Sequence, residues 1–331
     1  MTLSSPDQVR FTLEHCALNP INLNHHQDLI DGLSQPFKSI PSRYFYDDLG
    51  SKLFEQICLL PEYYPTRTET KILQEYSDKI AKHTGNLALV ELGSGSSTKT
   101  RYLLDAYNHC YSSLHYIPID ISGSILKDSV LSLLDDYPNL TIDGKVGTYE
   151  QCLANLSVAE QQQKMIMFLG STIGNFDPEE CDRFLDLISS ALNPGDYFLL
   201  GLDLQKPKPI LEAAYNDSQS ITAQFNLNIL QHLNWKFQGN FDLNLFEHQA
   251  IYNEQQNQIE MYLVSQQAQS IDLGVLDLTI QLAPEEKILT EISRKFDVGQ
   301  ISQILEHKNL SFCQSYTDEQ KWFSLLLFQQ K

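Results

Sequence analysis

The chain has 331 residues, which is the length of two ordinary domains or of one large domain with an insertion. Hydrophobic residues make up 42% and charged residues 20% of the chain, a composition that excludes a disordered or collagen-like protein. Only 23 Lys and Arg oppose 42 Asp and Glu, so the formal net charge is −19. A surface of this charge repels phosphate backbones and anionic lipids, and we expect neither nucleic acid nor a membrane as a partner.

The chain contains no obvious targeting or metal-binding signal. No apolar run approaches the roughly 18 residues that span a bilayer, and no basic segment followed by an apolar one opens the sequence. We therefore expect no signal peptide and a cytoplasmic location. The six cysteines and nine histidines are scattered, and no CxxC pair occurs. This usage is typical of a reducing compartment and predicts neither a disulfide framework nor a metal site.

Strands and helices alternate from about residue 87. Five strands are predicted by short apolar runs at 87–92, 115–119, 140–146, 164–169 and 197–202. Asp177, Pro178 and Glu180 form a capping signal for the helix that follows the fourth strand. Parallel strands joined by helical crossovers predict a doubly wound α/β sheet.

The alternation stops near residue 207, where helices follow, the clearest at 221–233. Further strand-like runs are at 249–252, 259–264, 275–282 and 288–296. A helix at 298–306 then precedes two β-like runs that predict a C-terminal antiparallel pair, 310–316 and 322–328. We therefore expect a core of residues 70–206 and 296–331, and a second, α+β domain of residues 1–69 and 207–295.

A glycine turn follows the first predicted strand. Gly93 and Gly95 let the backbone approach a ligand closely, with the N–H groups of the next helix pointing at it. Thr98 stands where a dinucleotide-binding turn has its third glycine. Glu91 precedes the turn and suits a ligand with a positive centre, while Asp120 ends the next strand and can accept hydrogen bonds from ribose hydroxyls. Together these residues favour S-adenosylmethionine over NAD.

Three further groups of residues are candidates for a substrate site. Asn175 follows the fourth strand, at the sheet edge where doubly wound folds bind ligands. Tyr46 and Tyr63 belong to aromatic clusters before the sheet, and tyrosine rings can stabilise ammonium groups. Glu291 and Ser293 are two residues apart in a strand-like run and share one face of it, where a carboxylate and a hydroxyl can hold a ligand with N–H donors. Each group also has a simpler explanation. Asn175 could be an ordinary turn residue, the tyrosines could only pack the core, and Glu291 and Ser293 could face solvent on an amphipathic strand.

Taken together, these stretches resemble the histidine-specific N-α-methyltransferase family of ergothioneine biosynthesis, from about Lys38 to Phe328. The most specific segments are YFYDDLGSKL (44–53), LPEYYPTRTE (60–69), VELGSGSSTKTR (90–101), FLGSTIGNF (168–176), ITAQFNLN (221–228) and TEISRKF (290–296). The resemblance implies a class I methyltransferase fold, which is a Rossmann-like α/β fold with a seven-stranded sheet, together with an inserted α+β substrate-binding domain. It also implies three methyl transfers from S-adenosylmethionine to the α-amine of L-histidine, giving hercynine.

The resemblance assigns roles to individual residues. Cofactor contacts fall on Gly93, Lys99 and Asp120, and contacts to the substrate carboxylate fall on Asn175 and Tyr215. The amine-side tyrosine is Tyr63, with Tyr46 nearby. The imidazole pocket is formed by Glu291 and Ser293, with Met261 as a packing wall. No metal is implied.

One departure from the family pattern lies after the third strand, where the adenine is expected. The family usually has an acidic residue and then an aromatic one, whereas this chain has Thr148 and Tyr149. Tyr149 keeps the aromatic contact, and Thr148 replaces a carboxylate acceptor with a hydroxyl. We therefore expect weaker contact with the adenine amine.

Three other functions compete with this interpretation. The same fold and chemistry could act on another amino acid such as tryptophan. An NAD-dependent oxidoreductase is disfavoured by the missing third glycine. A non-catalytic binding module is disfavoured by the intact set of Tyr63, Asn175 and Glu291. We expect a monomer with a small-molecule substrate.

Overall fold

The computed structural model describes residues 10–16, 26–154, 156 and 162–331. Its main sheet has eight strands in the order β1-β5-β4-β3-β6-β7-β14-β13. These are β1 (Phe11–His15), β3 (Ala88–Leu92), β4 (Leu114–Asp120), β5 (Leu140–Val146), β6 (Lys164–Phe168), β7 (Tyr197–Asp203), β13 (Leu310–Thr317) and β14 (Phe323–Gln330). The first six of these pair in parallel, and β14 and β13 add an antiparallel edge.

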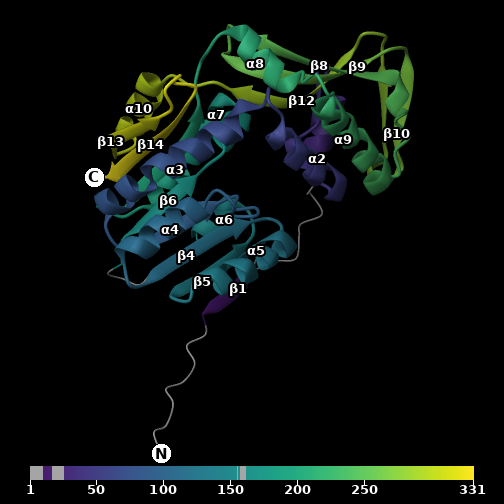
Figure 1. The fold of residues 1–331 in the computed structure, drawn as a ribbon. Helices are drawn as coiled ribbons and strands as arrows, with labels where there is room; N and C mark the ends of the chain where they lie inside the picture. Colours follow the sequence, from purple (N-terminus) through teal and green to yellow (C-terminus); the bar gives the residue numbers. More distant parts are fainter. Residues whose placement is uncertain (1–9, 17–25, 155, 157–161) are drawn as a thin grey trace, which may run out of the picture.

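Helices cover both faces of the main sheet (Figure 1). One face packs against α3 (Tyr64–Thr84), α4 (Arg101–Cys110) and α5 (Gly123–Asp136). The other packs against α6 (Tyr149–Ala154), α7 (Pro178–Ala191) and α10 (Val298–His307). Neighbouring strand residues serve opposite faces, as Leu89 and Val90 do, because side chains alternate along a strand. Strands buried on both faces read as continuous apolar runs, which is why the sequence predicted them.

The predicted fold class is confirmed, with one correction to the sheet. β1 pairs in parallel with β5 and makes eight strands where seven were expected. Residues 11–15 therefore lie in the main sheet and not with the second domain. The predicted capping of α7 is confirmed, because the Asp177 side chain accepts from the Glu180 N–H and the Glu180 side chain accepts from the Asp177 N–H.

A second body is built from the remaining segments (Figure 1). Its helical elements are α1 (Gln27–Ser34), η1 (Ser42–Phe45), α2 (Asp48–Leu59), α8 (Lys208–Tyr215), α9 (Ile221–Phe237), η3 (Leu243–Leu245) and η4 (Gly274–Leu276). Its strands are β2 (Lys38–Ser39), β8 (Phe246–Asn253), β9 (Gln258–Ser265), β10 (Gln269–Leu273), β11 (Leu278–Leu282) and β12 (Lys287–Arg294). β2, β12, β9 and β8 form one sheet and β10 and β11 a hairpin. The strand expected at 275–282 begins at Leu278, after η4.

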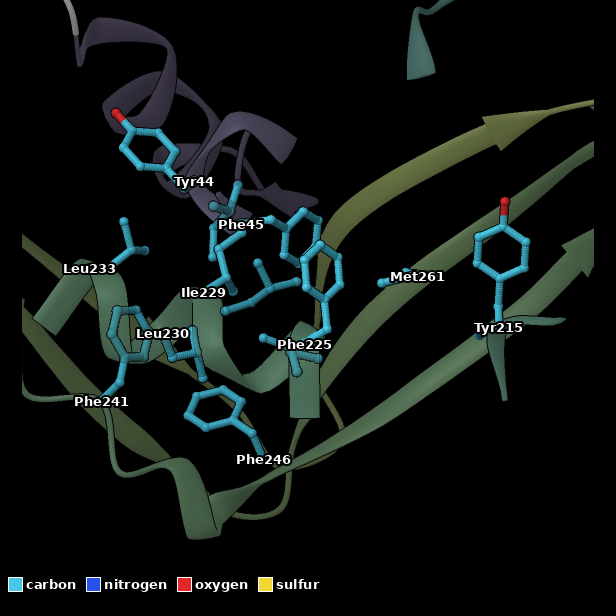
Figure 2. Close-up of a cluster of buried hydrophobic side chains, with 14 of the residues drawn as sticks. Tyr44, Phe45, Tyr215, Phe225, Ile229, Leu230, Leu233, Phe241, Phe246 and Met261 are labelled. Carbon is cyan, nitrogen blue, oxygen red and sulfur yellow. The ribbon is translucent and has the colours of Figure 1, made fainter. Parts of the chain in front are cut away.

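The second body has its own hydrophobic core, part of which is shown in Figure 2. Phe45 stacks on Phe225 of α9, with ring centroids 4.4 Å apart, so a segment before the main sheet joins the insert. Met261 lies at the edge of this cluster, between Phe225 and Tyr215 (Figure 2). The separate cores support the proposed division into residues 70–206 with 296–331, and 26–69 with 207–295.

The two bodies are joined where the chain leaves β7 and where it returns after β12. The Phe296 N–H donates to the Asp203 carbonyl at 2.9 Å, and the Gln205 N–H donates to the Phe296 carbonyl at 3.1 Å. Asp203 is the last residue of β7. The joint therefore lies at the carboxyl end of the parallel strands, where doubly wound folds bind their ligands.

The cysteine interpretation is wrong for one pair. Cys16 and Cys152 form a disulfide with their Cα atoms 5.2 Å apart, although 136 residues separate them in the sequence. Cysteine spacing along the chain does not report such a long-range approach. Across the described residues, no helix is long and apolar enough to cross a membrane, and no cluster of three or more metal-ligating side chains occurs.

Candidate active site

The glycine turn after β3 has the backbone conformation that its sequence predicts. Gly93 and Gly95 have φ angles of +67° and +50°, a region that side chains other than glycine rarely adopt. The N–H groups of Gly93 and Ser94 donate to the Ile119 carbonyl at 2.8 and 3.2 Å, which ties the turn to β4. A Cβ at Gly95 would meet no atom within 4 Å. The turn therefore leaves room for a ligand beside the backbone.

The two acidic residues of this region have different partners. Both Glu91 carboxylate oxygens accept from the Thr100 hydroxyl, at 2.7 and 2.6 Å, and one also accepts from Tyr116. Burial raises the Glu91 pKa to about 7, although these hydrogen bonds oppose the shift. Glu91 thus anchors the strand to the start of α4, and its direct contact with a ligand stays a prediction. Asp120 is partly exposed and accepts from the Gly95 N–H at 2.9 Å, beside the turn.

Lys99 lies on the same side of the sheet, paired with a buried carboxylate that sequence reasoning missed. Glu69 of α3 is fully buried and contacts the Lys99 ammonium. Its other oxygen accepts from the Gly170 N–H at 2.7 Å, so Glu69 links the lysine to the loop after β6. Burial alone lowers the Lys99 pKa, but the Glu69 charge reverses the shift and raises it. The Lys99 side chain is therefore fixed in position by Glu69 and carries a full positive charge.

Thr148 and Tyr149 lie at the start of α6. The Thr148 hydroxyl accepts from the Gln151 N–H at 3.4 Å, so it serves the helix end. The Tyr149 ring packs against Phe168 at 5.5 Å, and its hydroxyl lies 3.1 Å from where a Gly93 Cβ would be. Tyr149 therefore lies beside the glycine turn.

Asn175 ends η2 (Thr172–Asn175), the short helix after β6. A Cβ at Gly174 would lie 2.9 Å from the Arg294 carbonyl, so this loop packs directly on the end of β12. Within the described chain, no protein group hydrogen-bonds to the Asn175 side chain. Its amide has both a donor and an acceptor available for a ligand.

Aromatic rings from three segments of the chain meet in the second body. The rings of Tyr63 and Tyr215 have centroids 6.1 Å apart, and Phe54 lies 6.3 Å from Tyr63 and 5.8 Å from Tyr46. Burial is the largest cause of the raised pKa of Tyr63, followed by its neighbours Tyr215, Cys58, Glu291 and Tyr46. The Tyr63 hydroxyl therefore stays protonated at neutral pH.

Glu291 is the group that distinguishes this site from a packed core. It lies opposite Met261 in the β12–β9 pair, and Met261 is only 1% exposed. Burial raises the Glu291 pKa to about 7, and the charge of Lys295 opposes the shift. In the described part of the chain, no donor hydrogen-bonds to its carboxylate. A partly buried carboxylate without a donor is costly to keep, so its partner is expected to be a ligand.

Ser293 and Tyr215 are hydrogen-bonded to each other. The Tyr215 hydroxyl, at the end of α8, donates to the Ser293 hydroxyl at 2.8 Å. Sequence reasoning missed the third member, Lys295, whose ammonium donates to the Ser293 hydroxyl at 2.8 Å. A signal was available, because residues 291, 293 and 295 continue one alternating pattern along a strand.

Comparison with known proteins decides the family. The sequence profile of the SAM-dependent, histidine-specific methyltransferases matches residues 25–330. The histidine N-alpha-methyltransferase of Mycolicibacterium smegmatis is 40% identical over 91% of this chain and 93% of its own length. That of Mycobacterium tuberculosis is 39% identical over the same shares. The chain belongs to the histidine-specific methyltransferase family.

The candidate site has two parts, one on the main sheet and one on the second body. The glycine turn, Lys99 and Asp120 lie on the main sheet, and the tyrosines and Glu291 lie on the second body. The L-tryptophan methyltransferase trpM of Psilocybe serbica is also similar, with 26% identity over 90% of both chains. Similarity over the whole length therefore extends to proteins with different named substrates, and the pocket residues must carry the specificity.

Proposed function

We propose that this protein transfers three methyl groups in succession from S-adenosylmethionine to the α-amino group of L-histidine, giving hercynine. The observation that carries the proposal is the Glu291 carboxylate. It lies opposite Met261 and two residues before Ser293, no donor among the described residues hydrogen-bonds to it, and burial raises its pKa to about 7. An imidazole N–H is a donor of the right kind for it.

The carboxylate end of histidine is assigned to Asn175 and Tyr215. The Asn175 amide is unengaged among the described residues, and Tyr215 lies across from Tyr63. The neutral Asn175 amide can donate to a carboxylate without bringing a competing negative charge, while the Tyr215 hydroxyl gives its own hydrogen to Ser293 and is assigned to the wall at this end. Anchoring both ends leaves the α-amine between them, free to rotate for each new methyl group.

The amine end is assigned to Tyr63, with Tyr46 nearby. The amine must be neutral to attack. The reference pKa of an α-amino group is about 7.7–8.0, somewhat higher in a free amino acid, so the cost is of order 1 kcal/mol near pH 8. A strong base is therefore unnecessary. Because the Tyr63 pKa is raised, its hydroxyl stays protonated and orients the lone pair while the proton passes to water. The aromatic faces tolerate the permanent positive charge of the product.

The residues around the glycine turn fit S-adenosylmethionine, whose sulfonium centre supplies an electrophilic methyl group. Gly93 and Gly95 provide close backbone approach, and Asp120 lies where ribose hydroxyls are bound in related folds. Lys99 suits the carboxylate of the methionine part, and the Tyr149 ring suits the adenine. The acidic surroundings favour a cationic donor.

The experiment is mass spectrometry of histidine and of tryptophan, each incubated separately with the protein and S-adenosylmethionine. We expect histidine to gain three methyl groups on the α-nitrogen and tryptophan to gain far fewer. Methylation of tryptophan in preference to histidine would reassign the substrate, and a ring-methylated histidine would refute the orientation. Release of free mono- or dimethylhistidine would show that the rounds are separate encounters.

A further inference from the structure

Lys295 is a buried ammonium in direct contact with Ser293 and Tyr215, two residues assigned to the proposed substrate site. Its side chain is fully buried, and it is the first residue after β12. The Nζ atom lies 2.8 Å from Asp203 Oδ2, 2.8 Å from the Ser293 hydroxyl and 3.2 Å from the Tyr215 hydroxyl. An ammonium group has three N–H donors, so these three acceptors use all of them.

These contacts dictate the direction of the hydrogen bonds around Ser293. Because an ammonium cannot accept, both hydroxyl oxygens must accept from Lys295. The Tyr215 hydroxyl in turn donates its own hydrogen to Ser293. Ser293 therefore accepts twice, and no acceptor for its hydrogen is present among the described residues. The Ser293 hydrogen is left for a ligand in the pocket.

The pocket thus presents one acceptor, Glu291, and one donor, Ser293, on the same face of β12. A neutral imidazole has one N–H and one nitrogen lone pair, and it matches both groups. An indole has an N–H and no lone-pair nitrogen, so it would leave the Ser293 hydrogen unpaired.

We propose that Lys295 is a positioning residue for substrate specificity: by donating to both Tyr215 and Ser293, it holds Ser293 as a donor, so that the pocket selects a neutral imidazole. This inference rests on the proposed function and deepens it. Lys295 acts through Ser293 and contributes no atom to the methyl transfer. A neutral hydrogen bond lost at this point corresponds to a discrimination of about three- to tenfold.

The experiment measures binding to the protein saturated with S-adenosylhomocysteine, by calorimetry. The ligands are histidine and the two pyrrolylalanine isomers, in which one imidazole nitrogen is replaced by C–H. The readout is the ratio of the Kd of the tighter pyrrole isomer to that of histidine. The variants are S293A, K295M and the double variant.

The matched control is K206M. Lys206 is a second buried lysine paired with Asp203, and its ammonium also donates to the Tyr64 hydroxyl at 2.9 Å. It contacts neither Ser293 nor Tyr215, so its loss removes an Asp203 ion pair without changing the pocket. We expect K206M to keep the wild-type Kd ratio.

The expected result is that K295M and S293A each lower the Kd ratio by about three- to tenfold, and that the double variant falls no further than S293A. Unchanged ratios in K295M, or effects that multiply in the double variant, would overturn the inference. A wild-type protein that binds no histidine would instead refute the proposed function itself. In K295M the Asp203 carboxylate keeps Lys206 as its partner. Since removing one member of a buried ion pair can still prevent folding, K295M/D203N/K206M, with D203N/K206M as reference, supplies a version of the same comparison without the Asp203 ion pairs.

Discussion

Replacing Glu291 with glutamine tests the central residue of the proposed pocket, because the amide keeps the shape and removes the charge. The amide oxygen can still accept from the ligand, so a charge-assisted hydrogen bond of about 1.5–3 kcal/mol is replaced by a neutral one of about 0.5–1.5 kcal/mol. The difference of about 1–1.5 kcal/mol, at 1.36 kcal/mol per tenfold change, corresponds to a loss of roughly 5- to 13-fold in kcat/KM for histidine. Because the bond anchors the substrate's far end, the loss should be mainly in KM.

The same substitution should stabilise the protein without ligand. The Glu291 pKa is raised from 4.5 to about 7 by burial, so the folded state resists ionisation. Unfolding is therefore favoured increasingly as pH rises from about 4.5 to 7, and the full penalty applies above 7. The shift corresponds to at most about 3 kcal/mol, reduced in practice because solvent reaches part of the side chain. We expect E291Q to melt roughly 2–6 °C higher at pH 8 and nearly unchanged at pH 4.5.

Glu260 on the neighbouring strand provides the control. It accepts from Asn253, Gln258 and Tyr262, and these hydrogen bonds outweigh burial and lower its pKa. The E260Q substitution should therefore lower the melting temperature at pH 8 and leave the KM for histidine unchanged. Thermal melts and steady-state kinetics on both variants are the assay. An E291Q variant with wild-type histidine kinetics would refute the assignment of the imidazole pocket, and one that melts lower at pH 8 would refute the argument from burial.

Three other predictions concern different parts of the molecule. Tyr63→Phe should lower kcat by at least tenfold while the Kd of S-adenosylhomocysteine stays within twofold; loss of cofactor binding without histidine would contradict the role of Tyr63. Glu69→Gln leaves the Lys99 ammonium without its buried carboxylate partner, so the melting temperature should fall. Adding S-adenosylhomocysteine should raise the melting temperature of this variant by more than that of the wild type. An equal rise would count against Lys99 as a cofactor contact. Cys16 and Cys152 are paired, so denatured, unreduced protein should show four reactive thiols, and six would contradict the disulfide.

Local patterns in the sequence predicted most of the fold. The wholly buried strands read as apolar runs, and the Asp177 capping signal placed the start of α7. β1 was missed because it has four exposed residues out of five and no apolar run. β10 was missed because it lies in a glutamine-rich stretch, where pairing with β11 supplies the order that its composition does not predict.

The chain by itself determined the chemistry available at the site: a glycine turn after a strand, a carboxylate and a hydroxyl two residues apart, and tyrosines before the sheet. Residue types and spacing are local properties, so they can be recognised in the sequence alone. Only the tertiary structure decided which groups pair. Glu91 is occupied by Thr100, Cys16 meets Cys152, and Lys295 joins Asp203 to Ser293, because these contacts form between segments that the fold brings together from far apart or across the end of a strand. The same packing leaves the Glu291 carboxylate without a hydrogen-bond donor among the residues that the structure describes, which the sequence alone could not show.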